Sequence, residues 1–298
     1  MPELRRDLIR DQWVLIVTEQ ALGPSYFPIN KNGTYVLNDR ICPFCGGNEN
    51  LTPPEIAAFR QPGSKPNDPD WIIRTVPSKY SAFEFVGEAT PEKKGIYNKC
   101  NAVGKQEVVI GTPDHEMDFS QFTPQRIELV YKMFQQRYKV LKTDPRIKYI
   151  QIYKNKGLFA GASQEHSHSQ IVGLPMVPEE NRGIDKYYDA KKECLICDIL
   201  LAEASAGLRV VYESEYFLLV CPYASRFSYE ICIIPKNHTA HFADITAVEL
   251  KDLAYTTKKI LDTIVRLLND PAYNIVINTA PVNSPAHPGY HWFMEITP

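Results

Sequence analysis

The chain lacks any apolar run that approaches the roughly 20 residues needed to cross a bilayer, so no membrane span is expected. It also lacks a surplus of either charge, since 33 basic and 35 acidic residues among 298 give a net charge of −2. These charges are interspersed, which predicts no dedicated nucleic-acid or membrane surface. The opening stretch MPELRRDLIRDQW lacks the apolar segment of a secretory signal. Together these absences favour a cytoplasmic protein.

An even, well-spaced set of cysteines, the mark of a disulfide framework, is absent as well. Of the seven cysteines, four form two C-x-x-C pairs and three stand alone in sequence. The pairs are Cys42 with Cys45 and Cys194 with Cys197. An odd total with closely spaced pairs is typical of intracellular thiols or metal sites.

An internal duplication is visible when the chain is read forward from each C-x-x-C pair. The first pair is followed by EVVIGTPDH, which ends at His115, and the second by EICIIPKNH, which ends at His238. Each stretch is expected to be a strand that opens with Glu and closes with a turn and a histidine. Each copy then ends with one more histidine, His166 in the first and His291 in the second.

Between those two histidines each copy has the pattern of a helix followed by a strand. The helices are expected at 126–141 and 247–268, and the strands at 147–153 and 273–278. This repeated unit predicts an α+β fold with largely antiparallel sheets and one main helix in each half. The stretch 51–106 is rich in Pro, Asn and Gly, so it is expected to form loops. Residues 179–193 are polar and favour a helix that connects the halves.

The repeated cysteines and histidines predict two metal sites. Two thiolates at C-x-x-C spacing and two distant imidazoles suit a closed tetrahedral zinc site, which stabilises loops and does not activate water. A redox pair or a merely buried pair is the alternative use of such a motif. The expected ligand sets are Cys42, Cys45, His115 and His166, and Cys194, Cys197, His238 and His291.

His168, in the stretch GASQEHSHSQ, is the histidine that the second copy does not repeat. In an extended chain it shares a face with His166 and Gln170, because residues two apart point to the same side. A metal on His166 would fix the backbone, and His168 would then be held in place as a nucleophile requires. The small neighbours Gly161, Ala162 and Ser163 and the amide of Gln170 suit a phosphoryl group. A histidine that is merely hydrogen-bonded at a turn is the alternative.

Several motifs together resemble the galactose-1-phosphate uridylyltransferase family of the histidine-triad superfamily, including the related ADP-sugar and dinucleoside-polyphosphate phosphorylases. These motifs are CPFC, PDH and NKGLFAGASQEHSHSQ followed by IVGLP, and the resemblance extends from RRDLIRDQWVLI to YHWFMEITP. In that family the first histidine of H-x-H-x-Q binds zinc and the second is the nucleophile. The resemblance therefore implies these roles for His166 and His168. It also implies that Gln170 binds the transferred phosphoryl group and that Asn155 and Ser163 belong to the same site.

The resemblance further implies two histidine-triad-like halves, 1–180 with the nucleophile and 190–298 without it, in a homodimer. The implied reaction is a double displacement. His168 would attack the α-phosphorus of a nucleoside diphosphate sugar, expel a sugar 1-phosphate and pass the nucleotide to a second phosphate-bearing acceptor. Uridylyl transfer from UDP-glucose to galactose 1-phosphate, in galactose metabolism, is the first expectation.

Two other functions stay open at this point. The same nucleophile could transfer AMP from an ADP-sugar or a dinucleoside polyphosphate to phosphate. The ending HWFMEIT favours that branch, because Phe293, Glu295 and Thr297 leave it without the two further histidines of the best-known uridylyltransferases. The third function is a zinc-stabilised nucleotide-binding protein without catalysis. The unrepeated His168 and Gln170 argue against it, because a pure binding protein would not need them.

Overall fold

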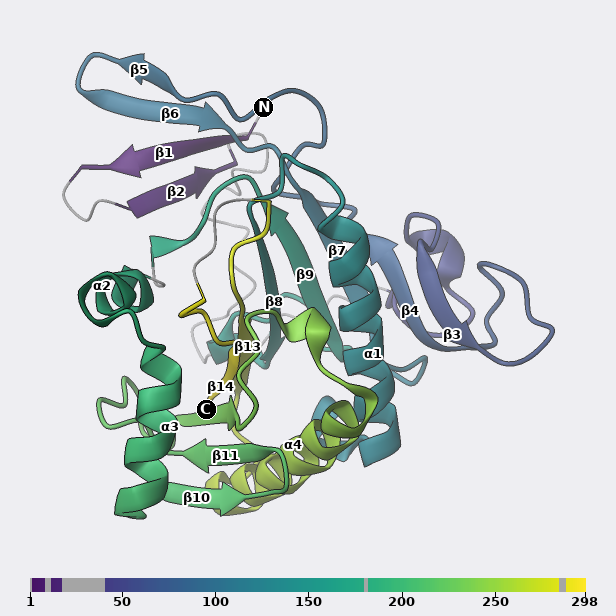
Figure 1. Ribbon diagram of the computed structural model, residues 1–298. Coiled ribbons are helices and arrows are strands. Elements are labelled where there is room, and N and C mark those ends of the chain that lie inside the picture. The colour runs from purple at the N-terminus through teal and green to yellow at the C-terminus, as the bar shows by residue number, and fades with distance from the viewer. Residues whose placement is uncertain (1, 9–11, 18–40, 180–181, 284–287) are drawn as a thin grey trace, which may run out of the picture.

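The computed structural model describes residues 2–8, 12–17, 41–179, 182–283 and 288–298, which form a large sheet, a small sheet and four α-helices (Figure 1). Neighbouring strands in both sheets are antiparallel. The first five strands of the large sheet are β3 (Ala57–Arg60), β4 (Trp71–Pro77), β7 (Lys105–Ile110), β8 (Tyr149–Lys156) and β9 (His168–Leu174). The other five are β10 (Val210–Glu213), β11 (Phe217–Val220), β12 (Ile231–Pro235), β13 (Tyr273–Asn278) and β14 (Phe293–Thr297).

The order of the strands in the large sheet is symmetric about its centre. The order is β10-β11-β12-β14-β13-β8-β9-β7-β4-β3, so β13 and β8 are the central pair. Moving outwards from this pair, β14 corresponds to β9, β12 to β7, β11 to β4 and β10 to β3. The two copies seen in the sequence therefore join edge to edge in one continuous sheet. The expected α+β fold of two repeated halves is confirmed.

The small sheet lies beside the large one and has the order β2-β1-β6-β5 (Figure 1). The expectation that 51–106 forms loops is wrong, because this stretch supplies β3, β4, β5 and β6. Abundant Pro, Asn and Gly mark the turns, and β4 nevertheless buries Trp71 and Ile73. The bounds of the small sheet's strands are Glu3–Asp7 (β1), Gln12–Ile16 (β2), Glu92–Lys94 (β5) and Tyr97–Asn101 (β6).

Helices α1 (Pro124–Leu141) and α4 (Ala247–Leu268) are the main helices of the two copies. Their starts are well specified, because Thr123 caps α1 before a proline and Thr246 forms a capping box with Glu249 at α4. Asn269 ends α4 in the left-handed conformation, at φ 55°. The expected connecting helix is also present as α2 (Arg182–Lys191), and α3 (Leu195–Ala206) follows it.

One hydrophobic core joins α1 and α4 to the large sheet. Buried residues of both helices and of both copies' strands belong to a single cluster. Within it the Tyr131 hydroxyl of α1 lies 2.9 Å from the Thr257 hydroxyl of α4. The helices thus cover one face of the sheet, and the site described next lies at strand ends and on the other face.

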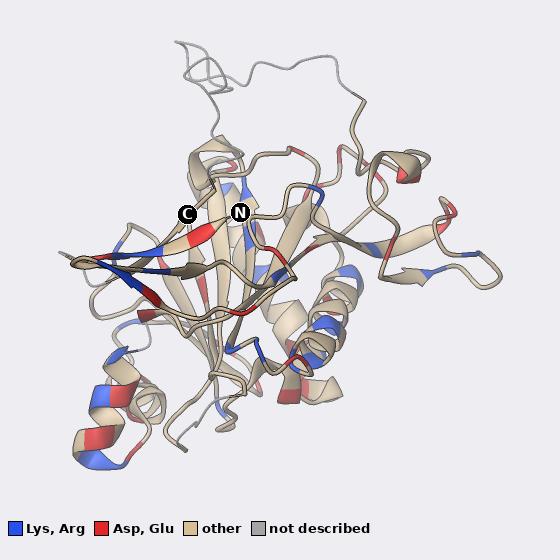
Figure 2. Cartoon of the chain, turned by 90° about the horizontal axis from the view of Figure 1, so that it is seen from above, with Lys and Arg blue, Asp and Glu red and all other residues tan. Residues whose placement is uncertain are grey.

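Lys, Arg, Asp and Glu are all spread over many elements of the chain (Figure 2). All seven cysteines have free thiols. Among the residues that the structure describes, no helix has both the length and the apolar character to cross a membrane.

Candidate active site and metal centres

His168 is the first residue of β9, and its ring is held by the backbone two residues earlier. Its Nδ1 lies 2.8 Å from the His166 carbonyl oxygen. Because a carbonyl can only accept, Nδ1 carries the proton and Nε2 keeps the lone pair. Burial lowers the pKa of His168 to about 4, against the opposing effect of that hydrogen bond. The ring is therefore neutral at pH 7, with Nε2 available for chemistry.

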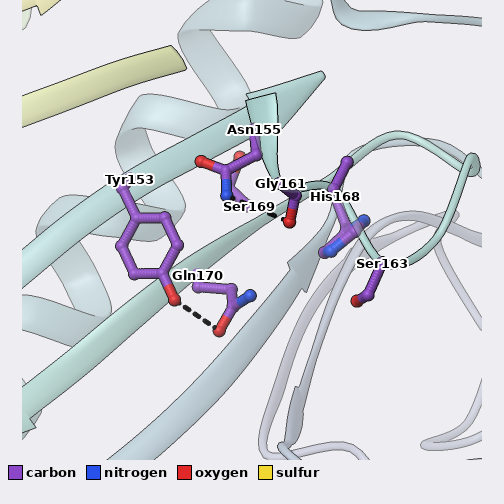
Figure 3. A pocket seen from close by; sticks show the side chains of 8 residues that line it. Tyr153, Asn155, Gly161, Ser163, His168, Ser169 and Gln170 are labelled. Atoms are coloured by element: carbon purple, nitrogen blue, oxygen red, sulfur yellow. Dashed lines mark hydrogen bonds between the residues drawn. The ribbon is translucent and has the colours of Figure 1, made fainter. Parts of the chain in front are cut away.

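A small pocket opens in front of this imidazole (Figure 3). It contains the six residues that the sequence singled out for catalysis and substrate binding, because β8, the turn after it and the start of β9 meet here. Gly161 has a φ of 81°, which a residue with a side chain rarely adopts. The pocket is lined by Tyr153, Asn155, Gly161, Ala162, Ser163, His168, Ser169 and Gln170.

Gln170 is oriented by two residues that the sequence reading missed. Its side-chain oxygen accepts hydrogen bonds from the Tyr153 hydroxyl, at 2.9 Å, and from the amide of Gln106. Its amide nitrogen is therefore directed towards the His168 side of the pocket (Figure 3). Tyr153 could have been found from its spacing, since it stands two residues before Asn155 on the same strand and so shares its face.

Asn155 is also held by a residue of the second copy. Asn274 on β13 donates from its side-chain nitrogen to Asn155 Oδ1 and to the Ala160 carbonyl, each at 2.8 Å. The pairing of Asn274 with Asn155 across β13 and β8 makes this contact. No local sequence signal indicated it, because the partners are more than 100 residues apart.

Lys154 lies behind the site, on the face of β8 that turns towards the helices. Its Nζ donates to the Ser167 hydroxyl at 3.0 Å and to the His168 carbonyl at 3.2 Å. Burial lowers the pKa of Lys154 to about 8, while the carboxylate of Asp118 acts in the opposite direction. A buried amine thus links β8 to the start of β9 directly behind His168.

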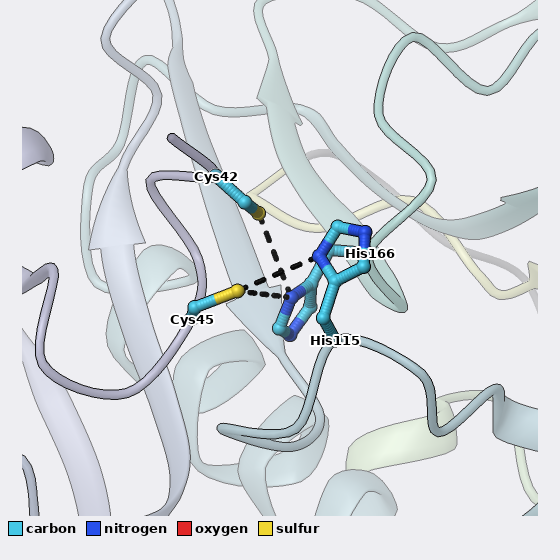
Figure 4. Close-up of side chains that lie close together, drawn as sticks. All are labelled: Cys42, Cys45, His115 and His166. Atoms are coloured by element: carbon cyan, nitrogen blue, oxygen red, sulfur yellow. Dashed lines mark hydrogen bonds between the residues drawn. The ribbon is translucent and has the colours of Figure 1, made fainter. Parts of the chain in front are cut away.

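The first expected ligand set comes together beside this site (Figure 4). One potential ligand atom from each of Cys42, Cys45, His115 and His166 lies within 4.8 Å of all the others. His166 Nδ1 is 3.6 Å from Cys42 Sγ and 3.7 Å from Cys45 Sγ, and His115 Nδ1 is 3.5 Å from Cys45 Sγ. The sulfur and nitrogen ligands of a tetrahedral zinc ion are about 3.6 Å apart by bond lengths, so these residues fit zinc.

Two further features of this cluster suit a cation. His166 Nε2 donates to the Thr112 carbonyl at 2.7 Å, which leaves Nδ1 unprotonated and turned towards the thiols. Burial, with the neighbouring Cys42, raises the pKa of Cys45 to about 11. A divalent cation at the centre would offset this cost of ionising the thiols.

The second expected ligand set comes together in the same way. The potential ligand atoms of Cys194, Cys197, His238 and His291 also lie within 4.8 Å of one another. Cys197 Sγ is 3.2 Å from His238 Nδ1 and 3.4 Å from His291 Nδ1. Cys194 caps the start of α3, where its sulfur accepts from the Cys197 amide. Both clusters could hold a metal, and the similar donor geometry repeats the first site in the second copy.

Comparisons with known proteins find similar sequences along the whole chain. Sequence models described as the N-terminal and C-terminal domains of galactose-1-phosphate uridyl transferase match residues 30–178 and 180–296. An ADP-glucose phosphorylase of Arabidopsis thaliana is 34% identical over all of this chain and 84% of its own length. A galactose-1-phosphate uridylyltransferase of Thermotoga maritima is 28% identical over all of this chain and 87% of its own length.

Solved structures give the same result for the fold. An ADP-glucose phosphorylase from Arabidopsis thaliana, with bound ADP-glucose, is 32% identical and superposes with a TM-score of 0.75. The match covers all of this chain and 89% of that one. A uridylyltransferase structure at 24% identity has a TM-score of 0.78 and shares the fold.

Proposed function

The chain belongs to the galactose-1-phosphate uridyl transferase family of nucleotidyltransferases, and from this premise we propose that it transfers a nucleotidyl group through His168. The observation that supports the proposal most strongly is the fixed orientation of the His168 ring. Its Nδ1–H is committed to the His166 carbonyl, and its Nε2 faces a pocket of small residues and amide donors. This arrangement presents one lone pair in one orientation, as a nucleophile needs.

The proposed first step forms a bond between Nε2 of His168 and the α-phosphorus of a nucleoside diphosphate sugar. The bond from that phosphorus to the bridging oxygen breaks, and the electron pair leaves with the sugar 1-phosphate. The ring becomes cationic, and the hydrogen bond from Nδ1 to the His166 carbonyl strengthens as it does. An oxygen of the acceptor phosphate then attacks the same phosphorus, and the electrons of the N–P bond return to the ring.

The other pocket residues bind the phosphoryl group in this proposal. The Gln170 amide, oriented by Tyr153, donates to a non-bridging oxygen. Asn155 and the Ser163 hydroxyl contribute further polar contacts, and Gly161 and Ala162 leave room for the phosphate to approach the backbone. These donors are uncharged, so they bind the group without neutralising the leaving phosphate.

Zinc is the metal that we propose for both clusters. With four protein ligands, each ion would cross-link its loops and take no part in the transfer. In the first half, the ligand His166 is two residues from His168, so the cross-link would fix the backbone that presents the nucleophile.

Adenylyl transfer from ADP-glucose to phosphate is the reaction that we favour. The 34% identity with an ADP-glucose phosphorylase supports it, as do Phe293, Glu295 and Thr297 at the end of the chain. Uridylyl transfer from UDP-glucose to galactose 1-phosphate, the first expectation from sequence, is the second candidate, supported by the Thermotoga maritima relative. Incubation with each donor and no acceptor decides between them, because the mass of the adduct on His168 identifies the base.

Four further expectations stay proposals. We expect a homodimer in the cytoplasm, where free thiols persist. We also propose the division into halves at 1–180 and 190–298. The partners in the reaction are a nucleoside diphosphate sugar and phosphate or a sugar 1-phosphate. Light scattering on purified protein tests the dimer directly.

A further inference from the structure

Asn274, a residue of the second copy, contacts a residue of the His168 pocket but does not line that pocket itself. Its side chain comes from β13 and lies opposite Asn155 of β8, which does line the pocket. The effect of Asn274 on a group bound beside His168 is therefore expected to pass through Asn155.

The two hydrogen bonds of Asn274 fix the direction in which both amides point. A carbonyl oxygen can only accept, so the atom of Asn274 that lies 2.8 Å from the Ala160 carbonyl is its amide nitrogen. The same nitrogen lies 2.8 Å from the Asn155 side chain. Two amide nitrogens would face each other as donors, so the Asn155 atom in this contact is Oδ1. Asn155 therefore turns its Oδ1 towards β13 and its Nδ2 away from β13.

The amide nitrogen of Asn155 has an N–H group available to a ligand. Its Nδ2 lies 3.5 Å from the Gly161 carbonyl oxygen, which is longer than a normal hydrogen bond (Figure 3). This contact uses at most one of the two N–H groups, so the other can donate to an oxygen of a bound phosphoryl group. The opposite orientation would present a lone pair to the phosphate oxygens. The orientation of the amide thus decides whether Asn155 attracts or repels the group.

The second copy has amides at the corresponding positions but holds them differently. The sheet is symmetric about β8 and β13, so Asn155 and Asn274 have Asn278 and Gln151 as their counterparts. Continuing the register of these strands by one residue places Gln151 opposite Asn278. Gln151 donates to the main-chain carbonyl of Ile277, at 3.3 Å. Of these two pairs, the one with the amide-to-amide bond is therefore the one beside the proposed nucleophile.

We propose that Asn274 is a positioning residue, which holds Asn155 with an N–H group towards the transferred phosphoryl group. The inference rests on the proposed function for the place of that group. The bond from Asn274 to the Ala160 carbonyl also holds the turn that ends directly before the pocket residue Gly161. The second copy thus supplies no nucleophile, but it orients one of the donors that the first copy uses.

Asn274→Asp inverts the polarity of this contact at nearly constant size. A carboxylate cannot donate, so Asn155 would turn its amide nitrogen towards position 274 and its oxygen towards the phosphoryl group. At saturating donor we expect the adduct on His168 to form about 10- to 100-fold more slowly, as for a lost hydrogen bond to a charged group. Asn274→Ala only releases Asn155, so it should slow this step less. A role in packing alone predicts the reverse order, because Asp fills the space and Ala leaves it empty.

Combining each change at position 274 with Asn155→Ala tests whether Asn274 acts through Asn155. Without the Asn155 amide there is nothing to orient, so Asn274→Asp should then slow adduct formation by less than about 2-fold. A direct effect of the added negative charge would persist in both backgrounds. Gln151→Glu adds the same charge at the counterpart position, and it should change the rate by less than about 2-fold. If Asn274→Asp does not fold, the smaller effect of Asn274→Ala must vanish in the same background.

The same set of variants can be compared by equilibrium binding, in which no transfer takes place. Titration calorimetry with AMP and with UMP, without a second substrate, measures how well the pocket holds a phosphoryl group. The monophosphate that binds the wild type more tightly should bind Asn274→Asp about 10-fold more weakly. The double variant with Asn155→Ala should bind it no more weakly than Asn155→Ala alone.

Additive effects at positions 274 and 155 would overturn the inference, as would a wild-type rate and affinity in Asn274→Asp. Wild-type protein that binds a monophosphate but forms no adduct would refute the proposed function, and the binding results would still decide the role of Asn274. Binding of neither monophosphate would show that the pocket takes no such phosphoryl group, which contradicts both proposals.

Discussion

Lys154 donates a hydrogen bond to the main-chain carbonyl of His168 from the covered face of the sheet, at 3.2 Å. Its second bond, to the Ser167 hydroxyl, fixes the residue between the proposed zinc ligand and the proposed nucleophile. The side chain itself is buried, with 4% of its surface exposed. Burying an amine away from water costs free energy, and these two hydrogen bonds offset that cost. They can form only while the His166–His168 segment keeps its conformation.

Replacing Lys154 by Met tests whether this contact positions His168. Met keeps most of the apolar stem but cannot donate, so we expect the rate of adduct formation to fall about 10-fold with little change in KM. Zinc content should stay unchanged, because no proposed ligand is altered. Single-turnover kinetics and metal analysis measure the two effects. A rise in KM at constant rate would instead assign Lys154 to substrate binding.

The buried amine also predicts a pH dependence of stability. Burial lowers the pKa of Lys154 in the folded chain to about 8, below the usual value near 10.5. Between these values the unfolded chain binds more protons, so the free energy of unfolding rises with pH. The contribution of this Lys154 pKa shift to the free energy of unfolding is fully present above about pH 10.5. It is lost as the pH falls to about 8. Urea unfolding of wild type and Lys154→Met across this range should show the difference, on the order of 3 kcal/mol.

Much of the fold could be predicted because the sequence repeats. Residues 247–268 and 273–278 match α4 and β13, and Asp270 and Pro271 between them are a clear stop signal for the helix. The strands within 51–106 were missed because turn-forming residues dominate this stretch, and because β4 and β6 each pair with a further strand beyond their hairpin partner. β6, for example, is paired with β1 through contacts such as Cys100 with Leu4. Propensity within a short window does not contain such pairings.

In the candidate site, too, local motifs could be recognised from the sequence, whereas contacts between distant residues could not. Cysteine and histidine spacing was enough to group the residues of both Cys–His clusters, which could each hold a metal. The H-x-H-x-Q motif singled out His168 and Gln170 as candidates. The supporting contacts of Lys154, Gln106 and Asn274 could not be derived, because a hydrogen bond across strands depends on register, which a single sequence leaves open.

The proposed zinc sites predict about two zinc ions per chain in carefully purified protein. Cys42→Ser and Cys194→Ser should each remove one ion and destabilise their own half, since structural zinc contributes directly to folding. Metal analysis and thermal unfolding measure both effects. Cys100→Ser is a control for loss of a thiol outside the clusters. Folded protein that contains no zinc would exclude zinc as the metal.

Tyr153→Phe should weaken the orientation of Gln170 without altering the shape of the pocket. The hydroxyl donates to Gln170 Oε1, and its removal leaves only the contact from Gln106 on that oxygen. We expect adduct formation to slow about 3- to 10-fold, as the loss of one neutral hydrogen bond implies. Tyr255→Phe, at an exposed position on α4, should have no effect. Equal rates in wild type and Tyr153→Phe would show that Gln170 needs no help from Tyr153.

The last prediction separates the two histidines of the H-x-H-x-Q motif. Incubation with the correct donor and no acceptor should leave one nucleoside monophosphate on His168, in an acid-labile phosphoramidate that is more stable in base. His168→Asn should abolish this adduct and leave zinc content and unfolding unchanged, because Asn is smaller, polar and not a proposed ligand. His166→Asn should lose zinc and stability as well as activity, because it breaks a set of four ligands.

The duplication explains why the two variants should differ. His166 has a counterpart in His291, and both belong to clusters of the same composition. His168 has Phe293 as its counterpart, so a half can be built without a histidine at this position. Peptide mapping by mass spectrometry locates the adduct. Full turnover by His168→Asn would refute the mechanism, whereas an adduct on another histidine would keep the reaction and move the nucleophile.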